Sequence, residues 1–523
     1  MQHNGPFTIP AINNVIPEKW KPFILILFVI IFQFSGGLYL ATANEMVGER
    51  ALLQEDILMA GYASLIGMAL TFAIMLRLKM RFTTKFAFLV CSIALIICNL
   101  ISLYTHNVAV LVITCFFAGI FKMWASFECN STIQLWLTPK RDLSVFFCYI
   151  YLLVQGSILL SGVANLYVSF FSNWEYMHWF IIAALLFVAI ITLLIFNSKR
   201  FMRPFPLFGI DWLGAFMWGL ILLNINFICL YGEHYDWWHS TEIKAASLFL
   251  AVLLVLNIFR ASFIRHPFIA LQTFTYKAVY LPFVLYIAVD IFLAPSYLIE
   301  HIYFDNLLKY DATHTTTINL IGCLGVLVGA IFSYYYFALK KNSYKSTFLI
   351  GFAFILMYLI CMYFLIDMQT TKAMLIAPIF FRNFGYVIIA IVLLTNLVKV
   401  PFHHFFQAVS VQAFISAACG SALGAAILHH FFKVVSTKNF QLISSNIDRV
   451  SHQLIKNGNI DLYQIIQNQV LLVTSKEIYG YLVIFGMGCF ISFLFYKYPH
   501  LPQNVNYPKM RSIKRMLRKE IQP

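Results

Sequence analysis

The sequence predicts an all-α polytopic membrane protein with fourteen transmembrane helices. Apolar residues make up 61% of its 523 residues and charged residues only 11%, whereas a soluble domain carries about 25% charged residues. The apolar residues also gather in long runs, each near the roughly 20 residues that a helix needs to cross a bilayer. Because these runs do not alternate apolar with polar residues, a β-barrel is excluded.

The predicted helices follow one another with short loops between them. The first six are 22–43, 57–75, 86–103, 108–133, 143–170 and 177–196. Two more, 213–230 and 243–258, precede the last six, which are 279–299, 315–337, 347–366, 373–398, 405–432 and 478–495. The one long connection is the outer loop 433–477, where apolar spacing in a polar segment favours an amphipathic helix, a docking surface or a packed cap over the pore mouth.

The net charge of +15 follows the predicted topology. Most Lys and Arg residues fall in the loops on the side of both termini, and an excess of basic residues in short loops marks the cytoplasmic side. We therefore expect an integral plasma (inner) membrane protein with both termini in the cytoplasm. The basic segment 499–523 is then a cytoplasmic tail, and a nucleic-acid partner is excluded by the apolar background.

Four charged residues fall inside predicted helices: Lys122, Glu128, Asp290 and Arg382. A charge at mid-membrane costs about 2.5–3.5 kcal/mol on insertion scales, so such residues point to a coupling or substrate cavity. Asp290 is the strongest candidate because it lies between two prolines, which bend helices. Lys122 and Glu128 are six residues apart and face different ways, so each needs a partner on another helix. The alternative is that all four form structural ion pairs.

Two basic loops suggest an internal repeat. The loops 75–86 and 338–348 are both tight and basic, and both end in hydroxyl residues followed by Phe. Equivalent loops predict two six-helix halves, 1–200 and 278–498, with an inserted two-helix linker, 201–277. Internal repeats around a central site are a transporter design. The candidate inner gating residues are Arg77, Arg81, Lys85, Lys340, Lys341 and Lys345, although the same residues could simply fix the topology.

Several motifs resemble the major facilitator superfamily, and most closely its fourteen-span drug:proton antiporter branch (EmrB/QacA-like). They are Asp211-Trp-Leu-Gly214 before the inserted pair, Asp236-Trp237 in the next outer loop, Arg382-Asn-Phe-Gly385, the small-residue run 411–424, and Arg449 with Ser475-Lys-Glu-Ile478. The resemblance implies helix-packing roles for Gly119, Gly156, Gly162, Gly420 and Gly424. The family's acid and glycines are missing from the loop after the second helix, and Cys115 stands where the family has Arg.

The resemblance implies a secondary active transporter that exports amphipathic or hydrophobic small molecules by alternating access. Proton coupling is one option, and an uncoupled or specific-substrate facilitator for a lipid or anion is the alternative. An integral-membrane enzyme and a scaffold or sensor are weaker alternatives. The expected partners are a small-molecule substrate, the lipid bilayer and, in a double-membraned bacterium, a periplasmic adaptor protein. No cofactor or metal is expected, because the acids and histidines of 233–239 match an outer-loop motif of the family.

Overall fold

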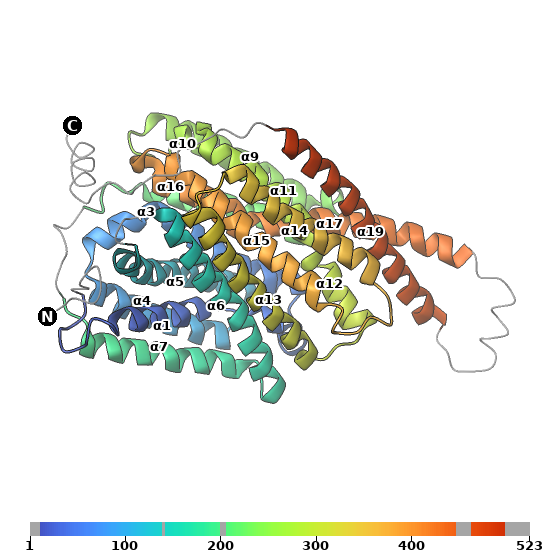
Figure 1. Cartoon of the computed structure of the whole chain (residues 1–523), viewed down its shortest axis with the longest axis horizontal. Coiled ribbons are helices and arrows are strands. Elements are labelled where there is room, and N and C mark those ends of the chain that lie inside the picture. The colour runs from blue at the N-terminus through green and yellow to red at the C-terminus, as the bar shows by residue number, and fades with distance from the viewer. Residues whose placement is uncertain (1–10, 139–141, 199–205, 446–461, 497–523) are drawn as a thin grey trace.

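The computed structural model describes residues 11–138, 142–198, 206–445 and 462–496, and its long elements are all helices (Figure 1). Within these residues, thirteen helices are long and apolar enough to cross a membrane, and the shorter apolar helix α1 makes the fourteenth. The predicted number of helices therefore matches. The predicted basic tail, 499–523, lies outside the described residues.

The first half is built from six main helices: α1 (Lys21–Phe34), α3 (Gln54–Arg81), α4 (Thr84–Tyr104), α5 (Val108–Leu137), α6 (Leu143–Phe171) and α7 (Glu175–Ile195). Polar side chains fix where several of them begin. Thr83, Asn107 and Asp142 each accept a backbone N–H from the first turn of the following helix. Such caps satisfy donors that the helix itself leaves unpaired.

The second half repeats this pattern with more interruptions. Its elements are α11 (Lys277–Leu293), α12 (Ile299–His301), α13 (Ala312–Ser333), α14 (Tyr344–Leu365), α15 (Ile376–Asn396), α16 (Phe402–Ala413), α17 (Gly420–Ser445) and α19 (Leu462–Phe495). A π-helical turn, Phe414–Cys419, joins α16 to α17. Between the halves lie α8 (Trp212–Tyr231), α9 (Thr241–Phe263) and the short α10 (Leu271–Thr275).

The first helix is shorter in the structure than the sequence predicts. Residues 22–43 were expected to be one span, but α1 ends at Phe34 and the chain leaves the helix through Ser35 and Gly36 to Gly37. Gly37 has a φ of 80°, a conformation that residues with a Cβ rarely adopt. The chain then forms a second short helix, α2 (Ala43–Arg50). Two adjacent glycines are the sequence signal for this break.

The long outer loop predicted at 433–477 is largely helical extension. Helix α17 continues to Ser445, and α19 already begins at Leu462. The two extensions are tied together because Asn439 Nδ2 donates to Thr474 Oγ1 at 3.1 Å and to Glu477 Oε2 at 3.0 Å. The described parts of this segment are therefore ends of the two helices rather than a separate cap, and residues 446–461 lie outside the described residues.

The two halves pack in equivalent ways. Helix α3 packs on α5 and α4 on α7, and their counterparts α13 and α14 pack on α15 and α19. The halves meet along two seams, where α3 contacts α16 and α6 contacts α13 (Figure 1). Helix α8 packs on both α3 and α17, so the inserted pair adjoins both halves.

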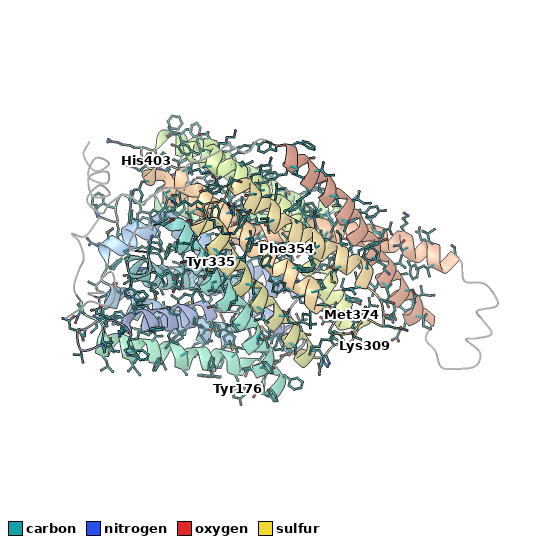
Figure 2. All side chains as sticks on the ribbon, in the orientation of Figure 1. Tyr176, Lys309, Tyr335, Phe354, Met374 and His403 are labelled. Atoms are coloured by element: carbon teal, nitrogen blue, oxygen red, sulfur yellow. The ribbon has the colours of Figure 1, made fainter. Side chains whose placement is uncertain are left out.

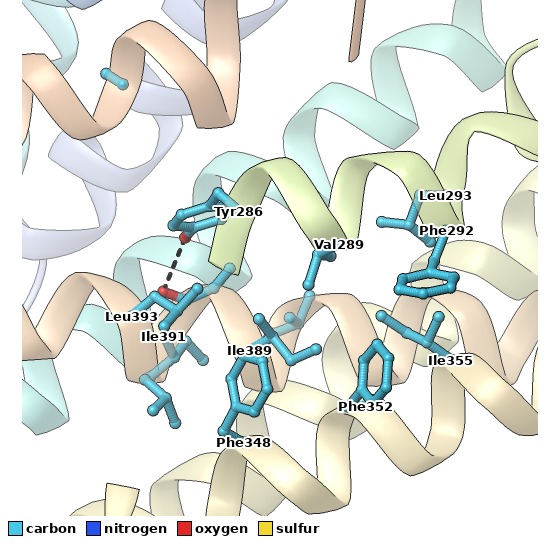
Figure 3. Packing of buried hydrophobic residues seen from close by; sticks show 14 of the residues in the cluster. Tyr286, Val289, Phe292, Leu293, Phe348, Phe352, Ile355, Ile389, Ile391 and Leu393 are labelled. Atoms are coloured by element: carbon cyan, nitrogen blue, oxygen red, sulfur yellow. Dashed lines mark hydrogen bonds between the residues drawn. The ribbon is translucent and has the colours of Figure 1, made fainter. Parts of the chain in front are cut away.

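Apolar side chains fill the second half and also cover the outside. Figure 3 shows Tyr286 and Phe292 of α11 facing α15 and α14, with the Tyr286 hydroxyl 3.3 Å from the Ala390 carbonyl oxygen. Figure 2 shows side chains projecting outward around the whole bundle, among them Tyr176 and Tyr335, which are 59% and 58% exposed. Large exposed apolar side chains on an apolar bundle suit a lipid surround.

Candidate functional site

Asp290 lies at the closest approach of α11 and α17. Its side chain is buried, and its Oδ2 atom has no hydrogen-bond partner among the described residues. A Cβ on Gly420 would overlap Asp290 Oδ2, and one on Gly424 would come within 2.9 Å of the Asp290 carbonyl oxygen. These two glycines therefore let α17 reach the backbone and carboxyl group of Asp290.

Tyrosines from both halves surround Asp290. Tyr62 of α3, Tyr386 of α15 and Tyr297 all lie close enough to interact electrostatically with its carboxyl group. Tyr62 also lies near Ser421, which directly follows Gly420. Tyr297 is 46% exposed although it lies among these residues. The site is thus polar, aromatic and shared between the halves.

A second tyrosine pair extends this site across the seam between the halves. The hydroxyl groups of Tyr151 on α6 and Tyr286 on α11 are 3.4 Å apart. Tyr151 also interacts electrostatically with Tyr386, which links it to the group around Asp290. Hydroxyl groups both donate and accept, so they can bind varied polar groups.

Arg382 does not pair with Asp290, although the prediction placed both in one cavity. It forms an ion pair with Glu300, whose other oxygen accepts from the Tyr358 hydroxyl at 2.7 Å. Tyr358 is in turn 3.1 Å from the Tyr479 hydroxyl. Glu300 is only 4% exposed, although the predicted helix 279–299 ends just before it. A 3-10 turn at Ala294–Ser296 interrupts the helix, but the same apolar span continues to Leu307, so Glu300 lies within the span.

Glu128 is held near the end of α3 that carries the basic loop. Lys79 Nζ lies 3.0 Å from Glu128 Oε1, and Thr84 Oγ1 donates to the same oxygen at 2.6 Å. Glu128 therefore ties α5 to the α3–α4 connection and is separate from the group around Asp290.

Lys122 is buried on α5 and forms no hydrogen bond or ion pair with any residue the structure describes. The four predicted intramembrane charges are thus not one cluster. Asp290 and Lys122 are left without charged partners within the described chain, while Arg382 and Glu128 belong to two separate ion pairs.

The basic loops make matching contacts in the two halves. Lys85 Nζ donates to the Leu193 carbonyl at the end of α7, at 2.9 Å. Lys345 Nζ donates to the Leu494 carbonyl at the end of α19, at 2.6 Å. Both contacts stay within their own half, so they hold each half together rather than latching one to the other. A Cβ on Gly209 would come within 3.0 Å of Arg77 Nη1, and the remaining basic residues are exposed: Arg81, Lys340 and Lys341.

The predicted packing glycines differ among themselves. Gly119 sits in a tight helix contact, because a Cβ there would overlap the Ser64 carbonyl oxygen on α3. At Gly156 and Gly162 a Cβ would meet no heavy atom within 4 Å. The packing role expected for these two is therefore wrong: α6 faces open space there, and no close neighbour requires a glycine.

In the outer-loop motif, Glu233 links the loop between α8 and α9 to α17; this set of contacts is called the Glu233 clasp. Glu233 accepts from Lys433 Nζ at 2.6 Å, from Trp237 Nε1 at 2.7 Å and from His430 Nδ1 at 3.3 Å. Burial opposes ionisation of Glu233, but these hydrogen bonds and the charge of Lys433 outweigh it and lower the pKa of its carboxyl to about 2. No group of three or more metal-ligating side chains occurs among the described residues.

The Asp-x-x-Gly motif fixes the start of α8. Asp211 accepts from the Gly214 N–H at 2.9 Å and forms an ion pair with Arg260 of α9. It also accepts from the Phe268 N–H at 3.1 Å. Although burial disfavours the charged form, these contacts lower the pKa of the Asp211 carboxyl.

Comparison with known proteins identifies the fold. No family model and no curated protein match the sequence. Solved structures do match. One is a proton-dependent oligopeptide transporter, with a TM-score of 0.59 and 11% identity over 91% of this chain and 97% of that one. Another is tetrameric PepTSo2, with a TM-score of 0.58 and 11% identity over 96% of this chain and 99% of that one. The nucleoside transporter NupG is also similar, with a TM-score of 0.52 and 12% identity over 89% of this chain and 98% of that one. The chain has a major-facilitator-type fold. At these identities the likeness shows the fold alone, and the drug-antiporter resemblance stays a prediction.

Proposed function

We propose that the protein is a secondary active transporter that moves amphipathic or hydrophobic small molecules out of the cell, with Asp290 as its coupling residue. The observation that carries this proposal is the buried Asp290 carboxyl group, which lacks a charged partner in the described chain and is surrounded by tyrosines from both halves. Structurally similar proteins are transporters for nucleosides and peptides. Intramembrane ionisable groups commonly mark proton or substrate paths.

The coupling step follows from the position of Asp290. An ionised carboxylate without a partner is costly in a membrane interior, and either a proton or a donor group of the substrate removes that cost. Because Asp290 rests on Gly420, a change in its charge acts directly on the contact between α11 and α17. Protonation and substrate binding would thus compete for one group at the junction of the halves, which is the requirement for antiport.

Alternating access needs a seam that can open. Near the end with the basic loops, Phe127 of α5 and Phe406 of α16 lie with ring centres 6.0 Å apart, edge to face. Deeper in the same seam, Ser410 Oγ donates to the Ala69 carbonyl at 2.7 Å. Rocking of the two halves would have to break these contacts to open the seam at this end.

The test is transport by purified protein in proteoliposomes, with and without an imposed pH gradient. A panel of fluorescent amphipathic compounds serves as substrate, and Asp290→Asn is compared with the wild type. Asp236→Asn is the matched control, since Asp236 is exposed in an outer loop. We expect gradient-driven accumulation in the wild type and the control, and none in Asp290→Asn. Accumulation that ignores the gradient in the wild type would favour the facilitator, and unchanged accumulation in Asp290→Asn would reject the coupling role.

A further inference from the structure

The ion pair of Arg382 and Glu300 adjoins the site at Asp290, but the proposed mechanism does not use it. Tyr297 connects the two, because it lies close enough to interact electrostatically with Asp290. The same tyrosine interacts in this way with Arg382 and Glu300. A ligand beside Tyr297 can therefore reach both Asp290 and the ion pair.

Tyr297 borders an open space inside the bundle. Its neighbours Tyr62 and Tyr386 come from α3 and α15, so Tyr297 lies between elements of both halves. It is nevertheless 46% exposed, although Pro295 and Ile299, close to it in the chain, are fully buried. Because these elements enclose Tyr297, its exposed surface faces a cavity between the halves rather than the outside of the bundle.

Arg382 is bonded on one side only. Its Nη1 atom donates to Glu300 Oε2, and its guanidinium carbon lies 5.9 Å from the centre of the Tyr358 ring. Its Nε and Nη2 atoms form no hydrogen bond with any residue that the structure describes. The side chain is 17% exposed. Since a guanidinium group carries five N–H donors, several of them remain for a ligand that enters the cavity.

Glu300 holds the guanidinium group in place. One of its carboxyl oxygens accepts from Arg382, and the other accepts from the Tyr358 hydroxyl at 2.7 Å. The Tyr358 hydroxyl lies 3.1 Å from that of Tyr479, and both tyrosines are fully buried. Arg382 is thus fixed through α12, α14 and α19. A donor group that is already held in position loses little freedom when a ligand binds.

The charges of the site decide which ligand groups fit. Glu300 already balances Arg382, so an anionic group at the guanidinium would add an unbalanced charge in the membrane interior, which is costly. An uncharged carbonyl oxygen satisfies the free N–H groups without that cost. When Asp290 is ionised, the two acids and one base leave one net negative charge. A protonated amine at Asp290 balances this charge.

We propose that Arg382 and Tyr297 bind an uncharged carbonyl oxygen of the substrate while Asp290 binds its amine, so that the transported compounds are amphipathic amines with a carbonyl group. This inference rests on the proposed transport function and adds the substrate class to it. The Tyr297 hydroxyl is a second donor beside the guanidinium. Because hydrogen bonds to charged groups are the stronger ones, Arg382 supplies most of the preference for a carbonyl.

Binding in detergent tests the inference without any gradient. The probes are haloperidol and melperone, two amphipathic amines with an aryl ketone, each paired with an analogue in which a methylene group replaces the ketone. Equilibrium dialysis gives the ratio of the two dissociation constants in each pair. We expect the wild type to prefer the ketones, and this preference to fall about tenfold in the double variant Arg382→Met with Glu300→Gln. The double variant leaves no unpaired carboxylate behind.

Two single variants make the outcome decisive. Tyr297→Phe removes only an exposed hydroxyl and should lower the preference about threefold, as one neutral hydrogen bond predicts. Arg265→Met changes an exposed arginine and should keep the wild-type ratio.

Three results would overturn the inference. One is a wild type that binds each methylene analogue as tightly as its ketone, or binds neither. The second is a double variant that keeps the wild-type preference. If the double variant elutes as misfolded protein, an unchanged ratio in Tyr297→Phe is the third. Failure of gradient-driven transport in liposomes bears on the proposed function instead.

Discussion

The contact between Gly420 and Asp290 gives the sharpest structural prediction. Gly420 has helical backbone angles (φ −63°, ψ −48°), so alanine meets no backbone penalty there. Its Cβ would nevertheless overlap Asp290 Oδ2 and lie 2.6 Å from the Ile415 carbonyl oxygen. The carboxyl group could rotate away, but the carbonyl belongs to the π-helical turn and cannot move alone.

The magnitude follows from two opposing effects. Forcing extra atoms into a packed contact costs about 1–3 kcal/mol. Replacing glycine by alanine inside a helix returns about 0.5–1 kcal/mol. Gly420→Ala should therefore be less stable than the wild type by about 1–2 kcal/mol. Gly156→Ala is the matched control, because a Cβ there meets nothing within 4 Å and the change should be neutral or stabilising.

The assay is thermal unfolding of detergent-purified protein, followed by tryptophan fluorescence. We expect Gly420→Ala to melt below the wild type and Gly156→Ala to melt at or above it. Because Asp290→Ala removes one of the two overlapping groups, the double variant with Gly420→Ala should be more stable than the sum of the single effects. Equal melting of both alanine variants, together with additive effects in the double variant, would refute the predicted contact.

Three further predictions concern the ion pairs. Lys79→Met and Glu128→Gln should each destabilise the protein in thermal unfolding, while the double variant should show a coupling of about 0.5–3 kcal/mol, and strict additivity would contradict the pair. The ionised Glu233 carboxylate stabilises the fold above its ordinary pKa of 4.5, and this stabilisation is lost as the pH falls through about 2. In Glu233→Gln the melting temperature should therefore depend less on pH between these two values. A pH profile of melting unchanged from the wild type would exclude the contribution of Glu233. Glu300→Gln removes the charged partner of Arg382 and should lower the melting temperature more than the control Glu242→Gln, which changes an exposed residue. Equal melting temperatures of the two variants would argue against the Arg382–Glu300 ion pair.

The number of helices was predictable because apolar runs act locally, whereas the exact division into two six-helix halves stays a prediction. The runs identify membrane helices by length alone, and the matching loops around Lys85 and Lys345 pointed to a repeat whose contacts do correspond. The early end of α1 was also visible in principle, since two glycines follow Ser35. The apolar run through residue 43 is long enough for one span, but these glycines end the helix at Phe34.

The partners of the charged residues could not be predicted, because pairing depends on how distant helices meet. Glu300 is only ten residues from Asp290, yet it pairs with Arg382 on α15, because the span that begins with α11 continues beyond its predicted end at residue 299. Glycine roles have the same origin: Gly119 and Gly156 are alike in sequence terms, but only Gly119 faces a neighbouring backbone. Residue type identified candidates, and the packing decided which of them meet.

The central claim is that the two halves rock around the site at Asp290, and restraining the seam tests it most directly. Phe127 and Phe406 lie on opposite halves with ring centres 6.0 Å apart. In a variant without its ten native cysteines, Cys at these two positions would be joined by a reducible bis-methanethiosulfonate reagent and transport measured in proteoliposomes. The account predicts that cross-linking stops transport and that reduction restores it, whereas full transport by the cross-linked protein would contradict it.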